Sequence, residues 1–249
     1  MSRLLVLIKK NLIRFAKDPI SLLFLIIIPV IYYGLLGLIF GSIDMQGLTL
    51  SAPGYLLYGP MMVLSFALVV LTGEKKAGIY RRLASTEVKN YEVILSSIIS
   101  NIALVFMQFA IGASVLAIFG WNPVVASILD GLIGIVITMF LFAFFLLALA
   151  FVFAPVFKKP ETAGGGVWIL IAPLAMFSGV FFPMYLLGEA MQNVAAWLPT
   201  RFAIVALENI LVKGQSIFYP ETMVNLGLLA LYSIIIFLIG IKAFKKFMK

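Results

Sequence analysis

The residue types that perform most enzyme chemistry are scarce in this sequence. It contains no His and no Cys, which excludes imidazole acid–base catalysis, thiolate chemistry, disulfides and His- or Cys-ligated zinc. A phosphate-binding loop is also missing, because the glycine run 164–166 is followed by Val167-Trp168 and not by a Lys. That run is better explained by a tight helix start or close helix packing. We therefore expect no catalytic residue, cofactor or metal site in this chain.

Asp130 is the single charged side chain in the long apolar stretch 93–157. An ionisable group inside a membrane span is a candidate for handling ions or substrate. Asp130 follows Pro123 by seven residues, however, which places it about 10 Å along a helix, towards the outer interface. We favour a solvated or helix-capping acid at the membrane edge, with the intramembrane role as the alternative.

The most informative charged segment is residues 73–92, GEKKAGIYRRLASTEVKNYE. Its charges alternate in sign, while Ile79, Tyr80 and Leu83 give it a modest apolar face. One interpretation is a basic connector between two membrane spans. Another is a short amphipathic helix that docks into a groove of a second protein through its apolar anchors. These residues alone leave both interpretations open.

The composition requires that these segments be held by membrane-spanning elements. The chain has 249 residues, of which 63% are hydrophobic and 11% charged, with a mean hydropathy of +1.17. A soluble domain typically has ~25% charged residues. Since a helix needs ~20 apolar residues to cross the hydrocarbon, we predict an all-α integral membrane protein with one transmembrane domain over residues 1–249. The six predicted spans are about residues 20–40, 55–72, 93–119, 127–155, 164–182 and 223–241.

The basic residues give this bundle an orientation. Sixteen of the eighteen Lys and Arg residues lie before the first span, at 73–92, at 158–159 or after the last span. The alternate connections, 41–54, 119–126 and 183–221, hold only Arg201 and Lys213. By the positive-inside rule we predict a multi-pass protein of the cell membrane with both termini cytoplasmic. The same segregation explains the net charge of +8 without nucleic-acid binding.

Two further segments flank the spans. Residues 1–18 have a helical period, with Leu4, Leu5, Ile8, Leu12 and Phe15 on one face and cations roughly opposite; we predict an interfacial helix whose cations face lipid headgroups. Residues 183–221 are apolar but repeatedly interrupted, and no piece reaches ~20 apolar residues. We predict short re-entrant or extracytoplasmic helices there.

Two stretches of the sequence resemble the permease subunits of type-2 ATP-binding-cassette (ABC) transporters. In residues 73–92 the matching residues are Glu74, Gly78, Arg82-Leu83 and Ser85-Thr86, while Glu87 departs from the family's pattern. Residues 177–211 resemble the Ser-Gly-x-x-x-Pro end of the family's fifth span and the Leu-Pro turn before its final helix. We assign to this outer region Phe177, Ser178, Gly179, Pro183, Trp197, Pro199 and Arg201.

The resemblance implies roles for these parts. Residues 74–83 would form a coupling helix on an ATP-binding subunit, through Glu74, Gly78, Ile79, Tyr80, Arg81, Arg82 and Leu83. Residues 1–18 would be the connecting helix, and residues 183–211 would cap the pathway outside. The implied partners are two ATPase subunits, which would bind ATP and Mg²⁺, and a second permease copy, identical or related.

The expected function is therefore the membrane-spanning subunit of an ATP-driven exporter of a small or lipidic amphipathic substrate. One alternative is a polysaccharide or glycan exporter of the same family. A second is a self-sufficient secondary transporter, which would need acids or broken helices near the membrane midplane. A third is an anchor for an ATPase-driven complex that transports nothing.

Overall fold

The computed structural model describes residues 3–43, 45–181, 184 and 187–248, and this part of the chain is helical without any strand. In chain order its elements are α1 (Arg3–Lys17), α2 (Pro19–Ile43), α3 (Met45–Leu56), α4 (Tyr58–Lys76), α5 (Ile79–Ala84), α6 (Asn90–Ile118), α7 (Ile128–Phe153), a 3₁₀ turn (Ala154–Val156), α8 (Pro160–Gly166), α9 (Trp168–Ser178), α10 (Glu189–Ala195), α11 (Pro199–Leu211) and α12 (Pro220–Met248).

The prediction of an all-α integral membrane protein is confirmed. Within the described residues, five helices are long and apolar enough to cross a bilayer, and α2 adds a shorter apolar helix at Leu25–Ile39. The five are Gln46–Lys76, Tyr91–Ile118, Ile128–Val156, Pro160–Ser178 and Pro220–Phe247. A helix pairs most of its own backbone groups internally, which is the requirement for crossing hydrocarbon.

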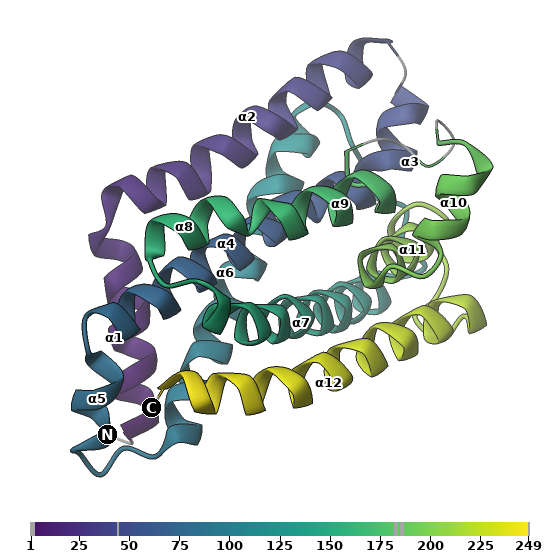
Figure 1. The fold of residues 1–249 in the computed structure, drawn as a ribbon. Helices are drawn as coiled ribbons and strands as arrows, with labels where there is room; N and C mark the ends of the chain where they lie inside the picture. Colours follow the sequence, from purple (N-terminus) through teal and green to yellow (C-terminus); the bar gives the residue numbers. More distant parts are fainter. Residues whose placement is uncertain (1–2, 44, 182–183, 185–186, 249) are drawn as a thin grey trace.

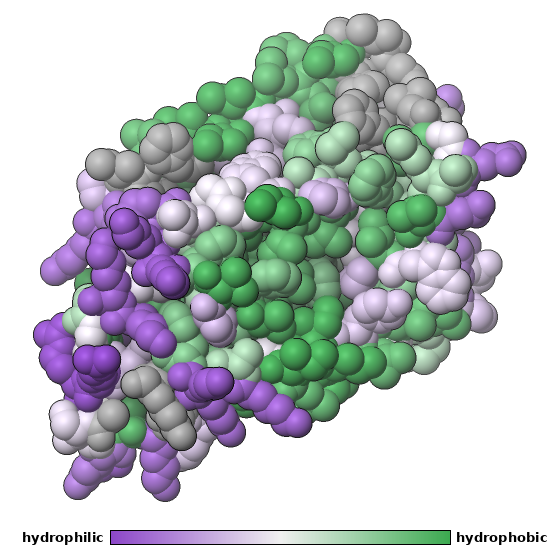
Figure 2. Space-filling model, in the orientation of Figure 1, coloured by the Kyte–Doolittle hydropathy of each residue, from purple (hydrophilic) through white to green (hydrophobic). Residues whose placement is uncertain are grey.

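Polar residues gather at the two ends of the bundle. Figure 2 shows hydrophilic residues massed where α1, α5 and the end of α12 meet, with a hydrophobic band beside them and a smaller hydrophilic area near α10. We call the first the basic end; it comprises residues 3–17, 73–92, 158–159 and 242–246. An apolar belt between polar ends is the distribution that a bilayer selects.

Helices α7 and α12 lie side by side along most of their length (Figure 1). Their contact is aromatic: the Phe151 ring lies 6.2 Å from that of Phe237 and 4.6 Å from that of Phe244. Gly240 lets the two backbones approach, because a Cβ there would lie 2.8 Å from the Ala148 carbonyl oxygen. Small residues have this use in helix pairs within membranes.

The predicted loop at residues 41–54 is wrong for most of its length. Residues 45–56 form α3, which continues through Leu57 into α4. Pro53 and Gly54 suggested a loop, but Leu48, Ala52 and Leu56 recur every four residues and are fully buried, and burial of that stripe outweighs the local signal. The predicted second span, 55–72, therefore begins about nine residues too late.

The junction between α3 and α4 shows how this bundle satisfies backbone groups where a proline interrupts the helix. Pro60 lies in the first turn of α4 and has no N–H to donate. The neighbouring N–H of Gly59 donates to the hydroxyl of Tyr33 on α2, at 2.9 Å. Tyr33 is fully buried. A side chain of one helix thus completes the hydrogen bonding of another.

The glycine run 164–166 lies inside α8, which starts at Pro160. A Cβ on Gly164 would lie 3.2 Å from Val69 of α4, and one on Gly166 would overlap Phe157. The run therefore permits close packing, as predicted. Helix α9 continues to Ser178 and ends at Gly179, whose φ of 97° few other residues adopt.

Between the fifth and last spans, α10 and α11 meet at an angle of 94°. Neither is long enough to cross a bilayer by itself. This bent pair has the form of the short helices predicted for residues 183–221.

The packing of α12 on α7 gives a test. Gly240→Ala should lower stability by about 1–3 kcal/mol, because the added methyl must push against the Ala148 backbone. Gly227→Ala on the same helix is the matched control, since a Cβ there meets nothing within 4 Å. Thermal unfolding of both variants in detergent should separate them, and equal melting temperatures would contradict the close approach.

Candidate functional site

Helix α5 protrudes at the basic end after a tight turn. Gly78 has a φ of 67° and no nearby atom at its Cβ position, so it is the turn itself that requires glycine. Arg81 and Arg82 are exposed, while Ile79 and Leu83 are half-buried. The Arg82 guanidinium donates to the carbonyl of Ala77 at 2.6 Å, which folds it back along the turn.

Tyr80 anchors α5 to the rest of the protein. It is buried, and its ring lies edge-on to Phe244 at 5.9 Å and next to Phe247 at 6.3 Å, both on α12. Its hydroxyl lies 3.1 Å from a carboxylate oxygen of Glu74 and donates to it. Burial first, and then the Glu74 charge, raise the pKa of Tyr80 well above its usual value. The phenol therefore stays a donor at any physiological pH.

Glu74 is the centre of a charged cluster. Its side chain is only 5% exposed and accepts from Lys10 Nζ at 2.7 Å and Arg14 Nη1 at 3.3 Å, both on α1. We call Lys10, Arg14, Glu74 and Tyr80 the Glu74 cluster. It joins α1, α4 and α5 at one carboxylate. A buried charge that keeps all its partners is tolerated, whereas one that loses them is strongly destabilising.

Three of the five cations of α1 are paired within the protein, while Lys9 and Lys17 are exposed. The cations of this helix were expected to face lipid headgroups, but Lys10 and Arg14 turn inward to Glu74, and Arg3 pairs with Glu87. The outward surface of α1 instead carries large apolar side chains that are 40–54% exposed, namely Leu5, Val6, Leu12 and Ile13. The helix is thus bound to the bundle by ion pairs together with apolar contacts of the buried Leu7 and of Phe15, whose ring lies 6.2 Å from that of Phe66.

The structure divides the residues predicted to couple to an ATPase. Glu74 and Tyr80 lie inside and position α5. The side chains that α5 offers to a partner are Arg81, Arg82, and the exposed parts of Ile79 and Leu83. Distance in the sequence hides this division, because Lys10 is 64 residues from Glu74.

Asp130 lies in the first turn of α7 and not in the middle of a span. Its carboxylate accepts from the Ser216 hydroxyl at 2.9 Å and the Ile217 N–H at 3.1 Å. Its own N–H donates to the hydroxyl of Ser127, the N-cap of α7. Ser127 is therefore the cap of α7, and the Asp130 carboxylate instead fixes the loop before α12. The acid lies at a helix end, as the sequence favoured, but the predicted capping role belongs to Ser127.

The residues predicted for the outer region lie at the end of the bundle opposite the basic end. Ser178, Gly179 and Pro199 are buried, while Trp197 is 74% exposed. Phe177 is half-buried on α9. Pro183 lies outside the described residues. The structure therefore buries Ser178, Gly179 and Pro199 inside the bundle, while the Trp197 side chain faces outward.

Arg201 has a partner that the sequence analysis missed. Its Nη1 and Nη2 donate to the two carboxylate oxygens of Glu208, at 2.9 and 3.2 Å. Both side chains are less than a quarter exposed. Positions seven apart on a helix lie on one face, and that spacing was the available signal.

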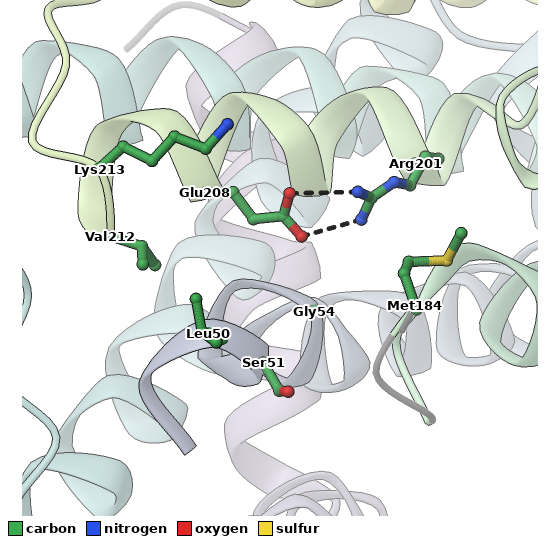
Figure 3. A pocket seen from close by; sticks show the side chains of 9 residues that line it. Leu50, Ser51, Gly54, Met184, Arg201, Glu208, Val212 and Lys213 are labelled. Atoms are coloured by element: carbon green, nitrogen blue, oxygen red, sulfur yellow. Dashed lines mark hydrogen bonds and ion pairs between the residues drawn. The ribbon is translucent and has the colours of Figure 1, made fainter. Parts of the chain in front are cut away.

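The pair lies on the wall of a cavity of about 260 Å³. The lining residues come from α3, from the end of α9 and the segment after it, and from α11 and the residues that follow it. We call the cavity the α11 groove, and its lining is Leu50, Ser51, Gly54, Gly179, Met184, Arg201, Glu208, Val212 and Lys213 (Figure 3). Helix α3 touches the end of α9 beside the groove, because a Cβ on Gly54 would overlap the Gly179 carbonyl oxygen.

A polytopic helical bundle with an apolar belt, a charged projection at one end and bent short helices at the other defines a multi-pass membrane protein. Its sequence over residues 44–242 matches the model of the ABC-2 family transporter proteins. Since the match covers most of the chain, the protein belongs to that family. The resemblance found in the sequence is confirmed.

One curated relative is the linearmycin resistance permease protein LnrN of Bacillus subtilis (strain 168). It is 24% identical over 200 residues, which cover 78% of this chain and 49% of the relative. The chain thus spans about half the length of that protein.

The Glu74 cluster predicts how α1 is held. Glu74→Ala should leave two cations without their carboxylate and lower stability by about 1–3 kcal/mol, at the modest end for a buried pair because both cations are about 40% exposed. Hydrogen exchange of residues 3–17 should rise at least tenfold. Glu189→Ala, an exposed acid on α10, is the control. Unchanged protection of α1 would contradict the assignment.

Proposed function

We propose that this chain is the membrane-spanning subunit of an ATP-driven exporter. A separate ATP-binding-cassette ATPase, present in two copies, would bind ATP and Mg²⁺ and dock at α5. A second permease copy would complete the pathway. Family membership supports this role, and α5 is the observation that carries it: a short helix, projecting at the basic end, with two exposed cations and half-buried apolar anchors.

The contacts of α5 suggest how movement would pass into the bundle. A force on α5 would reach α12 through the rings around Tyr80 and would reach α4 and α1 through Glu74. Lys75 adds a second link to α12, because its ammonium lies 4.1 Å from the centre of the Phe247 ring. Coupling would follow if nucleotide and substrate each favour a different arrangement of these helices.

The proposed substrate is a small or lipidic amphipathic compound moved outward. The Bacillus subtilis relative is named as a resistance permease, and resistance fits export of a compound better than export of a polymer. A polysaccharide or glycan exporter of the same family is the alternative. ATP-dependent accumulation in inverted vesicles, with amphiphiles and glycans compared, would choose between them, and no accumulation of either would favour a non-transporting anchor.

A self-sufficient secondary transporter is the less supported alternative. It would need ionisable groups at the membrane midplane. Asp130 was the candidate, and its carboxylate is engaged at the end of α7 by Ser216 and Ile217. Transport by the reconstituted chain alone, driven only by an ion gradient, would reverse this preference.

Docking at α5 can be tested by charge reversal. Arg81→Glu/Arg82→Glu should reduce the co-purified ATPase at least tenfold, because an ATPase surface that attracts the two Arg side chains would repel two Glu side chains. Both side chains are exposed, so the bundle should still fold. Lys89→Glu reverses an exposed charge in the same segment outside α5 and should retain the ATPase. Full retention in the double variant would remove α5 from the proposal.

The orientation has its own test, since the chain has no Cys of its own. Phe218→Cys, at a position 75% exposed near the start of α12, should react with a membrane-impermeant maleimide in intact cells. Lys246→Cys, at the basic end, should react only after the membrane is opened. The reverse pattern would invert the topology and place α5 outside.

A further inference from the structure

The α11 groove is an apolar cavity with one charged wall. In Figure 3, Arg201 and Glu208 extend from α11 along the space between that helix and α3, and Leu50 extends towards it from the α3 side. Leu50, Val212 and Met184 supply the apolar lining. A few placed polar groups in a mostly apolar concavity are the usual composition of a small-molecule site.

The Arg201–Glu208 pair does not hold the fold together. Both residues lie on α11, so their contact joins no second element, in contrast to the Glu74 cluster. The pair has lost most of its hydration, a cost that ion pairs recover only with good geometry and further hydrogen bonds. An ion pair that has lost its hydration on the wall of a cavity is suited to binding a polar group of a ligand.

Arg201 has donors left for a ligand. A guanidinium has five N–H donors, and Glu208 is the one acceptor found for this side chain among the described residues; it takes two of them. Lys213 is already engaged: its ammonium donates to Asn209 Oδ1 at 2.8 Å and lies 3.6 Å from Glu221. Arg201 is therefore the group that would meet an anionic oxygen, with bidentate geometry that suits phosphate and carboxylate.

We propose that the α11 groove binds a single-chain anionic amphiphile, with its phosphate or carboxylate on Arg201 and its hydrocarbon against Leu50, Val212 and Met184. The volume of about 260 Å³ lies just below the ~300–1,000 Å³ of drug-sized pockets. It accommodates a head group and a few carbons but not a whole two-chain lipid. This site goes beyond the proposed function, because binding there needs neither an ATPase nor transport.

Hexyl phosphate is a suitable probe, measured by titration calorimetry on the whole chain in a neutral maltoside detergent. We expect one site that binds hexyl phosphate at least tenfold more tightly than inorganic phosphate or 1-hexanol. Arg201→Gln should weaken binding at least tenfold. Glu208→Gln should tighten it three- to tenfold, because the amide keeps one acceptor oxygen in place of two, which frees a donor of Arg201, and because it removes a repelling charge.

Two further variants test the geometry. Lys242→Gln removes an exposed cation at the basic end, away from the groove, and should change affinity less than threefold. Leu50→Trp, which fills the groove and leaves the charges in place, should abolish binding. If Arg201→Gln unfolds because Glu208 loses its partner, the double variant Arg201→Gln/Glu208→Gln removes both charges together and should likewise fail to bind.

The opposed effects of the two single variants decide the matter. A merely structural pair would weaken binding in both variants, and that result would overturn the proposal. Wild-type affinity in Arg201→Gln would overturn it as well. If inorganic phosphate bound as tightly as hexyl phosphate, the groove would be a site for anions alone, and the proposal that it binds an amphiphile would be overturned.

Discussion

One buried carboxylate determines how the basic end is built. Glu74 lies at the end of a membrane-spanning helix with almost no access to water. Its carboxylate is paired with the ammonium of Lys10 and the guanidinium of Arg14, and it accepts a hydrogen bond from the phenol of Tyr80. Removing such a group from water costs several kcal/mol unless partners replace the lost hydration. Those partners come from α1 and α5, so neither helix can leave without exposing Glu74 to that cost.

The same end also gathers both extremities of the chain. Lys75, adjacent to Glu74, donates to the carbonyl of Phe247 near the end of α12, and Tyr80 packs on the same helix. The N-terminal helix, the middle of the chain and its last helix are therefore joined within a few residues of α5. For the transport role that we propose, this makes α5 a part of the bundle's framework and not a loose connector.

The sequence predicted what the bilayer demands and missed what tertiary packing decides. Apolar length predicted most of the spanning helices because hydrocarbon tolerates little else, and the distance from Pro123 predicted that Asp130 lies near the start of a helix. Helix α3 was missed because Pro53 and Gly54 are local turn signals, whereas the burial of Leu48 and Ala52 depends on neighbours distant in sequence. The inward turn of Lys10 and Arg14 was missed for the same reason. The partner of Arg201 was within reach, since Glu208 lies two helical turns away.

The two ion-pair sites differ in what a rearrangement of the helices would do to them. The Glu74 cluster spans three helices, so any separation of α1 or α5 from α4 must break it. The Arg201–Glu208 pair lies within α11 and would travel with that helix unchanged. What would change is the opposite wall of the groove, because Leu50 and Ser51 belong to α3, which is continuous with α4 and hence with Glu74.

A displacement of α4 at the basic end would therefore alter the width of the groove while its charged wall stayed intact. If the groove binds the amphiphile proposed above, its occupancy and the position of α4 would influence each other to the same extent in free energy.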